Sequence, residues 1–216
     1  SIQSDIQVVI KFIEQVALYY EKVKTIGTMK LNSPEEYVQK YIDKDDGLYL
    51  ADMFYRHSLE AYHDLITKQN PIEQTINDAK NQLDQEYAKL TNVLNLEWLT
   101  CVIERQELFE SLSIGKQEEF YNNESEPSAK QVVIISDALR YEVAAELMQE
   151  LSKEKHIAKL LPYKAMLPTE TKYCKTALLP HRTLELQGAE MIVDGRPLIT
   201  TEQRTAHLAR YREGAV

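Results

Sequence analysis

Apolar side chains recur every three or four residues through most of residues 1–110, which is the spacing of one face of an α-helix. A first helix is predicted from Ile2 to Val23, and Gly27 is expected to end it. Two longer periodic stretches follow, one over residues 48–66 and one over residues 71–109. The front of the chain is therefore predicted to be helical almost throughout.

Two polar motifs predict where further helices begin. Ser33 is followed three residues later by Glu36, and Thr200 is followed three residues later by Gln203. In this spacing the hydroxyl accepts a hydrogen bond from a backbone N–H of the first turn, and the later side chain returns one. Helices are therefore expected directly after Ser33 and directly after Thr200.

A change of pattern follows the polar residues 122–130, which are expected to form a linker. The run Gln131–Ile135 is β-branched and apolar on both faces, as in a buried strand of a parallel sheet. Apolar residues spaced by four then predict a helix over 139–151, and Ile157–Leu161 is expected to add a strand and complete a βαβ unit. Met191–Gly195 is typical of a hairpin that turns at Asp-Gly.

The predicted fold class is therefore α+β. An acidic helical domain is expected over residues 1–121, a linker over 122–130, and an incomplete α/β domain with a short, mainly parallel sheet over 131–216. Two or three strands are few for a complete α/β domain, so the chain is expected to be a piece of a longer protein. An unpaired sheet edge would favour self-association.

Charge is unevenly distributed along the 216 residues. The formal net charge is −9, with −10 in residues 1–130 and +1 in residues 131–216. An acidic front half argues against binding of duplex DNA. No apolar run is long enough to span a membrane. Cys101 and Cys174 are the two cysteines and form no CxxC motif, so a reducing, cytoplasmic location is expected.

Asp137 is the first candidate site residue, because it follows the predicted strand and precedes the predicted helix. The carboxyl ends of strands in open α/β sheets are where ligands gather, and a carboxylate there suits a divalent cation. The alternative is that Asp137 only caps the helix.

Thr171 is the second candidate, because it lies just ahead of a short helix predicted over 172–179. Backbone N–H groups at a helix start favour a bound phosphate. A threonine hydroxyl needs a base or a metal to act as a nucleophile, and a metal on Asp137 would meet that need. The alternative is again a helix cap, which Thr169 could also provide.

Two sequence strings carry a family resemblance. Residues 132–142 read VVIISDALRYE, and residues 167–171 and 177–181 read LPTET and ALLPH. Together these strings resemble the signature blocks of PglZ-domain proteins, which belong to the BREX and phage-growth-limitation systems of bacteriophage resistance. The resemblance covers residues 131 to about 212 and includes no motif of the helical front half.

The resemblance implies a core similar to the alkaline phosphatase superfamily and a metal-dependent phosphatase or phosphodiesterase activity. Asp137 matches the first metal-binding aspartate and Thr171 the Ser/Thr nucleophile of that superfamily. Arg140 and Lys172 adjoin these residues and are weaker candidates for contacting a phosphoester substrate. The implied cofactor is a divalent metal: zinc, manganese or magnesium. The family's later ligands, in motifs such as Asp-His-Gly, are absent from residues 1–216, so this stretch alone is expected to be inactive.

Other candidate site residues have weaker support from the sequence. Cys174 and Arg182 are separated by seven residues rather than the five of a cysteine phosphatase, and no glycine-rich phosphate loop occurs. His57 and His63 are six residues apart, which does not suit a helical metal pair.

A second hypothesis is a non-catalytic scaffold in a defence complex, whose methyltransferase or ATPase components the family resemblance implies as partners. A third is a Rossmann-like module that binds a ligand at Asp137 without chemistry.

Overall fold

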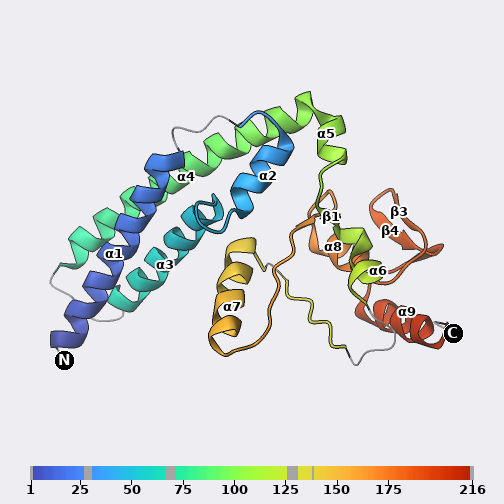
Figure 1. The fold of residues 1–216 in the computed structure, drawn as a ribbon. Coiled ribbons are helices and arrows are strands. Elements are labelled where there is room, and N and C mark those ends of the chain that lie inside the picture. Colours follow the sequence, from blue (N-terminus) through green and yellow to red (C-terminus); the bar gives the residue numbers. More distant parts are fainter. Residues whose placement is uncertain (1, 27–30, 67–71, 126–130, 138, 215–216) are drawn as a thin grey trace. The chain divides into compact units, whose positions relative to one another are not determined.

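The computed structural model describes residues 2–26, 31–66, 72–125, 131–137 and 139–214 of the chain (Figure 1). Backbone contacts divide the chain into two compact units. Unit 1 comprises Ser1–Ser113 and Arg140–Ala158, and unit 2 comprises Ile114–Leu139 and Lys159–Val216. The chain therefore leaves unit 1, returns to it for one helix, and leaves it again.

Unit 1 is helical. Its long helices pack lengthwise, with α1 against α3, and α3 also contacts α4 and α7 (Figure 1). The shorter α2 and α5 contact α4 and each other. The helices are α1 (Ile2–Ile26), α2 (Pro34–Ile42), α3 (Tyr49–Ile66), α4 (Glu73–Glu104), α5 (Gln106–Glu110) and α7 (Tyr141–Lys153). The prediction of an all-helical front half is confirmed.

The predicted cap of α2 is also present. The Glu36 backbone N–H donates to Ser33 Oγ at 3.2 Å, and the Glu36 carboxylate accepts from the Asn32 backbone N–H at 2.8 Å. The return bond therefore reaches one residue further back than in the usual capping box. Gly27, the predicted end of α1, lies outside the described residues, and α1 extends to Ile26.

The core of unit 1 lies between α1, α3 and α4. One cluster includes the fully buried Tyr19 and Leu83, and a second includes Phe12 and Ala61. The periodic apolar residues of α1 are buried only in part. Val16, Tyr20 and Val23 pack against the first cluster, beside the buried Tyr19. Three other apolar residues of this helix are about half exposed: Ile6, Ile10 and Ile13.

Tyrosine hydroxyls bind carboxylates at several points in unit 1. Asp52 accepts hydrogen bonds from Tyr41 at 2.9 Å and from Tyr87 at 2.8 Å, and Asp84 accepts one from Tyr55 at 3.0 Å. The rings of Tyr55 and Tyr87 stack with centroids 3.7 Å apart. These bonds satisfy the hydroxyl groups of Tyr41, Tyr55 and Tyr87. The hydroxyl of the buried Tyr19 has no hydrogen-bond partner among the described residues.

A buried ion network joins α7 to α3. Glu142, whose side chain is 1% exposed, accepts a hydrogen bond from Arg56 Nε at 3.1 Å. Arg140 Nε lies 3.4 Å from the other Glu142 oxygen, and Arg140 Nη2 lies 3.3 Å from Asp52. Arg56 also pairs with Glu146 at 2.5 Å. Five charged groups, two arginines and three carboxylates, thus form one network between α3, α7 and the residue before α7.

Unit 2 combines short helices with two small sheets. Strands β1 (Gly115–Lys116) and β2 (Tyr163–Lys164) pair in parallel. A separate antiparallel sheet has the order β3-β4-β5 (Figure 1). Its strands are β3 (Leu184–Gln187), β4 (Glu190–Val193) and β5 (Arg196–Pro197), and the helical segments are η1 (Gln117–Glu119), α6 (Phe120–Glu124), α8 (Thr171–Ala177) and α9 (Thr201–Gly214). The α+β class and the presence of a small parallel sheet are confirmed.

The Asp-Gly hairpin is confirmed in detail. Strands β4 and β5 pair across Asp194 and Gly195, whose φ angles are 48° and 75°. Two successive left-handed residues form the turn whose twist matches a hairpin, and glycine adopts that conformation without strain. Val193 is fully buried beside Leu179 and Leu198, so the hairpin also forms the local core.

The two strands predicted for a βαβ unit are wrong. Residues 131–135 and 157–161 are not in strands. Val132 is 85% exposed, Ile134 is 86% exposed and Ile157 is fully exposed. A strand forms only where a neighbour completes its hydrogen bonds, and no described strand pairs with either segment. The apolar pattern indicates that these side chains favour a strand, but it does not show whether a neighbouring strand is present.

The predicted domain boundaries stay a prediction. Residues 126–130 of the proposed linker lie outside the described residues, whereas α6 includes residues 122–124. The division by contacts places residues 114–121 in unit 2 and α7 in unit 1. In the described part of the chain, no helix is long and apolar enough to cross a membrane.

Candidate functional site

Asp137 and Thr171 lie side by side in unit 2, although 34 residues separate them in the sequence. The Thr171 hydroxyl donates a hydrogen bond to Asp137 Oδ1 with an oxygen–oxygen distance of 3.2 Å. Asp137 lies in a turn that precedes α7, and Thr171 is the first residue of α8. The side chain of Asp137 is 57% exposed, and Thr171 is also exposed. The pair is therefore open to a ligand from solvent.

Neither residue acts as a helix cap. The N-cap of α7 is Arg140, three residues after Asp137, and the N-cap of α8 is Glu170. Neither helix has a side-chain hydrogen bond at its cap. The capping alternative predicted for Asp137 and Thr171 is therefore wrong, and the polar groups of both side chains meet each other instead.

Lys175 is a third member of this site. Its Nζ lies 3.4 Å from Asp137 Oδ2, the oxygen that Thr171 does not contact. Lys175 follows Thr171 by four residues on α8, so both side chains lie on one face of the helix. Sequence reasoning missed Lys175, although that spacing was available once Thr171 had been singled out. We name Asp137, Thr171 and Lys175 the Asp-Thr-Lys site.

The two weaker candidates have other partners. Lys172 Nζ lies 3.3 Å from Glu170 and 4.5 Å from the centre of the Tyr173 ring. The hydrogen bonds to Tyr173 and Glu170 raise the pKa of Lys172, so its ammonium group remains charged. Arg140 belongs to unit 1, where it pairs with Asp52 and Glu142. A role for Lys172 or Arg140 in substrate binding stays a prediction.

The Asp-Thr-Lys site fits a metal in part. A carboxylate and a hydroxyl are oxygen donors of the kind that magnesium and manganese prefer, and zinc also accepts carboxylate. The described residues contain no cluster of three or more His, Cys, Asp or Glu side chains that could hold an ion. Asp137 would therefore be one ligand of a cation whose other ligands lie elsewhere.

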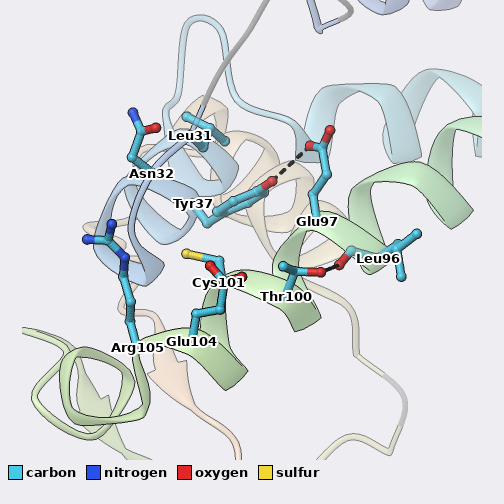
Figure 2. A pocket seen from close by; sticks show the side chains of 9 residues that line it. All are labelled: Leu31, Asn32, Tyr37, Leu96, Glu97, Thr100, Cys101, Glu104 and Arg105. Carbon is cyan, nitrogen blue, oxygen red and sulfur yellow. Dashed lines mark hydrogen bonds between the residues drawn. The ribbon is translucent and has the colours of Figure 1, made fainter.

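The cysteines do not form an alternative nucleophilic site. Cys101 lies in a hollow of about 480 Å³ between α2 and α4, which Figure 2 shows together with its other lining residues. In that hollow the Tyr37 hydroxyl donates to Glu97 at 2.9 Å. Burial raises the pKa of both cysteine thiols, that of Cys101 and that of Cys174. A thiol with a raised pKa is a poor nucleophile at neutral pH.

Comparison with known proteins identifies the part of the chain that contains this site. Residues 118–216 match the model of the BREX system PglZ alkaline phosphatase-like domain. This region of the chain is therefore similar to a PglZ domain. The PglZ match includes all three residues of the Asp-Thr-Lys site, and it also includes α7, which packs in unit 1.

Two curated proteins resemble this chain over about half of the chain's length. The chain is 34% identical over 122 residues to the alkaline phosphatase-like protein BrxZ of Escherichia coli O9:H4 (strain HS). It is 30% identical over 127 residues to the alkaline phosphatase-like protein PglZ of Bacillus cereus (strain H3081.97). These regions are 52% and 56% of this chain, but the chain covers only 14% and 15% of the relatives. No solved structure matches the chain significantly.

Proposed function

We propose that the Asp-Thr-Lys site is part of the phosphoester site of a metal-dependent phosphatase or phosphodiesterase that acts in bacteriophage resistance. The single observation that supports this proposal is the hydrogen bond from Thr171 to Asp137. It joins the two residues that the family resemblance assigns to nucleophile and metal ligand. The names of the relatives, alkaline phosphatase-like BrxZ and PglZ, agree with a phosphoester reaction.

Each residue of the site has a separate task in this proposal. Asp137 accepts the hydrogen bond of the Thr171 hydroxyl and thereby orients it. This leaves a lone pair of Oγ1 free to attack phosphorus. In the attack the bond from Oγ1 to phosphorus forms, the bond from phosphorus to the leaving oxygen breaks, the hydroxyl proton passes to Asp137, and the leaving alkoxide takes a proton from solvent. Water then attacks phosphorus, the bond from phosphorus to Oγ1 breaks, and Oγ1 regains the proton from Asp137. This step releases phosphate from a monoester substrate and a phosphomonoester from a diester substrate.

Lys175 and the metal both offset negative charge. A phosphoester that approached Asp137 alone would meet a like charge, and the ammonium group 3.4 Å from Oδ2 reduces that repulsion. Asp137 is the residue of this chain that would hold the divalent cation. A bound zinc, manganese or magnesium ion would polarise the phosphoryl group and lower the pKa of the Thr171 hydroxyl.

The test uses the full-length protein that contains this chain. Hydrolysis of a generic phosphodiester and a phosphomonoester is measured with added zinc, manganese or magnesium. We expect Thr171→Ala to reduce turnover by at least about a hundredfold, because the nucleophile is lost. Asp137→Asn should abolish the dependence on metal, and Thr169→Ala, which removes the neighbouring hydroxyl, should leave turnover unchanged.

Two results would contradict the proposal. Equal turnover in wild type and Thr171→Ala would remove the threonine from the reaction. An inactive wild type under all three metals, with its fold intact, would favour a scaffold instead of an enzyme.

A separate observation supports a scaffold function. Helix α4 exposes a row of apolar side chains at helical spacing: Leu96 is 67% exposed, Leu99 is 53% exposed and Ile103 is 76% exposed. Such a row is typical of a surface that another protein covers. In this proposal unit 1 would bind another defence component, such as a methyltransferase or an ATPase.

The scaffold function is tested by co-purification of the full-length protein with those components. We expect Leu96→Asp combined with Ile103→Asp to abolish co-purification. Asp78→Lys, a charge change elsewhere on α4, should leave it intact. Retained binding in the double variant would refute this surface as the docking site.

A further inference from the structure

Unit 2 also contains a hollow, and arginine side chains line it. Its volume is about 640 Å³, and it lies between the β4–β5 hairpin, the loop after α8 and helix α9. Three arginines line it, one from each of these elements: Arg182, Arg196 and Arg210. His207 and Tyr211 of α9 complete one wall, and Asp194 lies at the hairpin turn. We name this hollow the arginine pocket. It shares no residue with the Asp-Thr-Lys site.

The three arginines lack acidic partners in the described part of the chain. Elsewhere in the described chain cationic side chains are commonly paired: Lys175 with Asp137, Lys172 with Glu170, and Arg56 with three glutamates. No ion pair within the described residues includes a guanidinium group of the arginine pocket. Several unpaired like charges around one hollow repel one another, and an anion would relieve that repulsion.

Asp194 lines the pocket but forms no ion pair with these arginines among the described residues, because its carboxylate faces the backbone instead. Asp194 Oδ1 accepts hydrogen bonds from the backbone N–H groups of Arg182 and Thr183, both at 2.9 Å. Burial alone would raise the pKa of Asp194, but these two bonds outweigh it and hold the pKa below its usual range. Asp194 thus ties the loop after α8 to the hairpin and fixes the backbone that bears Arg182.

The wall formed by α9 is also fixed. The His207 ring is bonded through Nε2 to the Pro180 carbonyl oxygen at 2.6 Å, which joins α9 to the loop after α8. The Tyr211 ring lies between the rings of His207 and Tyr121, with centroids 5.5 Å and 6.1 Å away. Ligand sites are usually largely preformed, and arginine binds phosphate through two parallel hydrogen bonds.

The size of the pocket indicates more than a lone inorganic ion. Pockets of roughly 300–1,000 Å³ suit small organic ligands. Guanidinium groups bind phosphate oxygens in pairs, and an aromatic wall offers a surface for a flat ring. We propose that the arginine pocket binds the phosphate group of a nucleotide. This binding is independent of the Asp-Thr-Lys site and of the reaction proposed there.

The test is calorimetric titration of the chain with AMP, with adenosine as the uncharged control and with a short oligonucleotide carrying a 5′-phosphate. We expect AMP to bind and adenosine not to bind. Arg196→Gln and Arg210→Gln should each weaken AMP binding about tenfold, the effect of one charged hydrogen bond at an exposed site. Added salt should weaken binding further.

A matched control separates this pocket from general charge. Lys159→Gln removes an exposed cation of unit 2 that does not line the pocket, and it should leave the affinity unchanged. Tighter binding of the 5′-phosphorylated oligonucleotide than of AMP would assign the same pocket to the end of a nucleic-acid strand.

Three outcomes would overturn the inference. The first is no heat of binding for either phosphate ligand at about 10 mM, the weakest range of a specific site. The second is equal affinity for AMP and adenosine. The third is unchanged affinity in the variant that carries both Arg196→Gln and Arg210→Gln, with circular dichroism showing an intact fold.

Discussion

Replacing Glu142 by glutamine removes the charge at the centre of the ion network in unit 1. The side chain keeps its size, so packing is preserved and the effect is electrostatic. Glu142 is 1% exposed, and its two oxygens face Arg56 at 3.1 Å and Arg140 at 3.4 Å. The substitution leaves two guanidinium groups, of which Arg56 is 26% and Arg140 52% exposed, beside a buried neutral amide.

The loss in the free energy of unfolding depends on the carboxylate partners that each arginine keeps. Removing one partner of a buried ion pair costs about 3–5 kcal/mol, because the remaining charge is left uncompensated. Arg56 keeps Glu60 and Glu146, and Arg140 keeps Asp52. The loss should therefore fall at the lower end, about 3 kcal/mol in the free energy of unfolding. For a chain of this size that corresponds to roughly 6–12 °C in melting temperature.

Urea unfolding of wild type and Glu142→Gln, monitored by circular dichroism at 222 nm, measures this difference. Glu60→Gln is the matched control, because it removes a carboxylate from the same arginine at a position where the side chain is 53% exposed. An exposed pair at this helical spacing contributes only about 0.3–0.5 kcal/mol. A large difference between the two variants would show that burial, not the number of contacts, decides the contribution.

The reasoning would be refuted if Glu142→Gln lost no more stability than Glu60→Gln. In that case the arginines would be neutralised by their remaining partners alone, and the position of Glu142 in the network would carry no special weight.

Three further predictions concern acid stability, the hairpin and the exposed apolar segment. Hydrogen bonds from Lys22 and Lys40 lower the pKa of Asp46 to about 2. The stability that this carboxylate contributes is therefore present above about pH 4 and is lost as the pH falls toward 2. Across that range, the urea midpoint should fall less in Asp46→Asn than in wild type or in the control Asp45→Asn. Gly195→Ala should destabilise the protein by about 1 kcal/mol in thermal melts, because alanine is strained at a φ of 75°, whereas Gly195→Asn should cost less. Light scattering should show concentration-dependent self-association that Val132→Asp with Ile134→Asp abolishes, and a clean monomer at high concentration in wild type would contradict this expectation.

Local signals along the sequence predicted the helices well. The capping motif at Ser33 and the Asp-Gly turn at 194–195 each involve residues within four positions of one another, so no distant partner is needed to interpret them. The inward face of the first half of α4 was also predictable, since Ile76 and Leu83 lie seven residues apart on an apolar stripe. In α1 the apolar residues surround the helix more widely, and the position of α3 decides which of them are buried.

Features that depend on distant partners were predicted less well. The apolar run 131–135 has the composition of a buried strand, yet a strand requires a neighbour that the pattern cannot reveal. The proximity of Asp137 and Thr171 rested on a family resemblance and not on spacing. The buried network of Glu142 was missed, because a glutamate in a helix is usually exposed and its partner Arg56 lies 86 residues away.

The bonds between tyrosines and carboxylates give unit 1 an optical signal of its own folding. Burial and the bond to Asp84 raise the pKa of Tyr55 to about 12, and the pKa values of Tyr19 and Tyr41 are raised further. In an unfolded chain these phenols would ionise near pH 10. Stability from this source is complete below pH 10 and declines as the solution becomes more alkaline. A rise of phenolate absorbance near pH 11 would therefore report the unfolding of unit 1, without any added label.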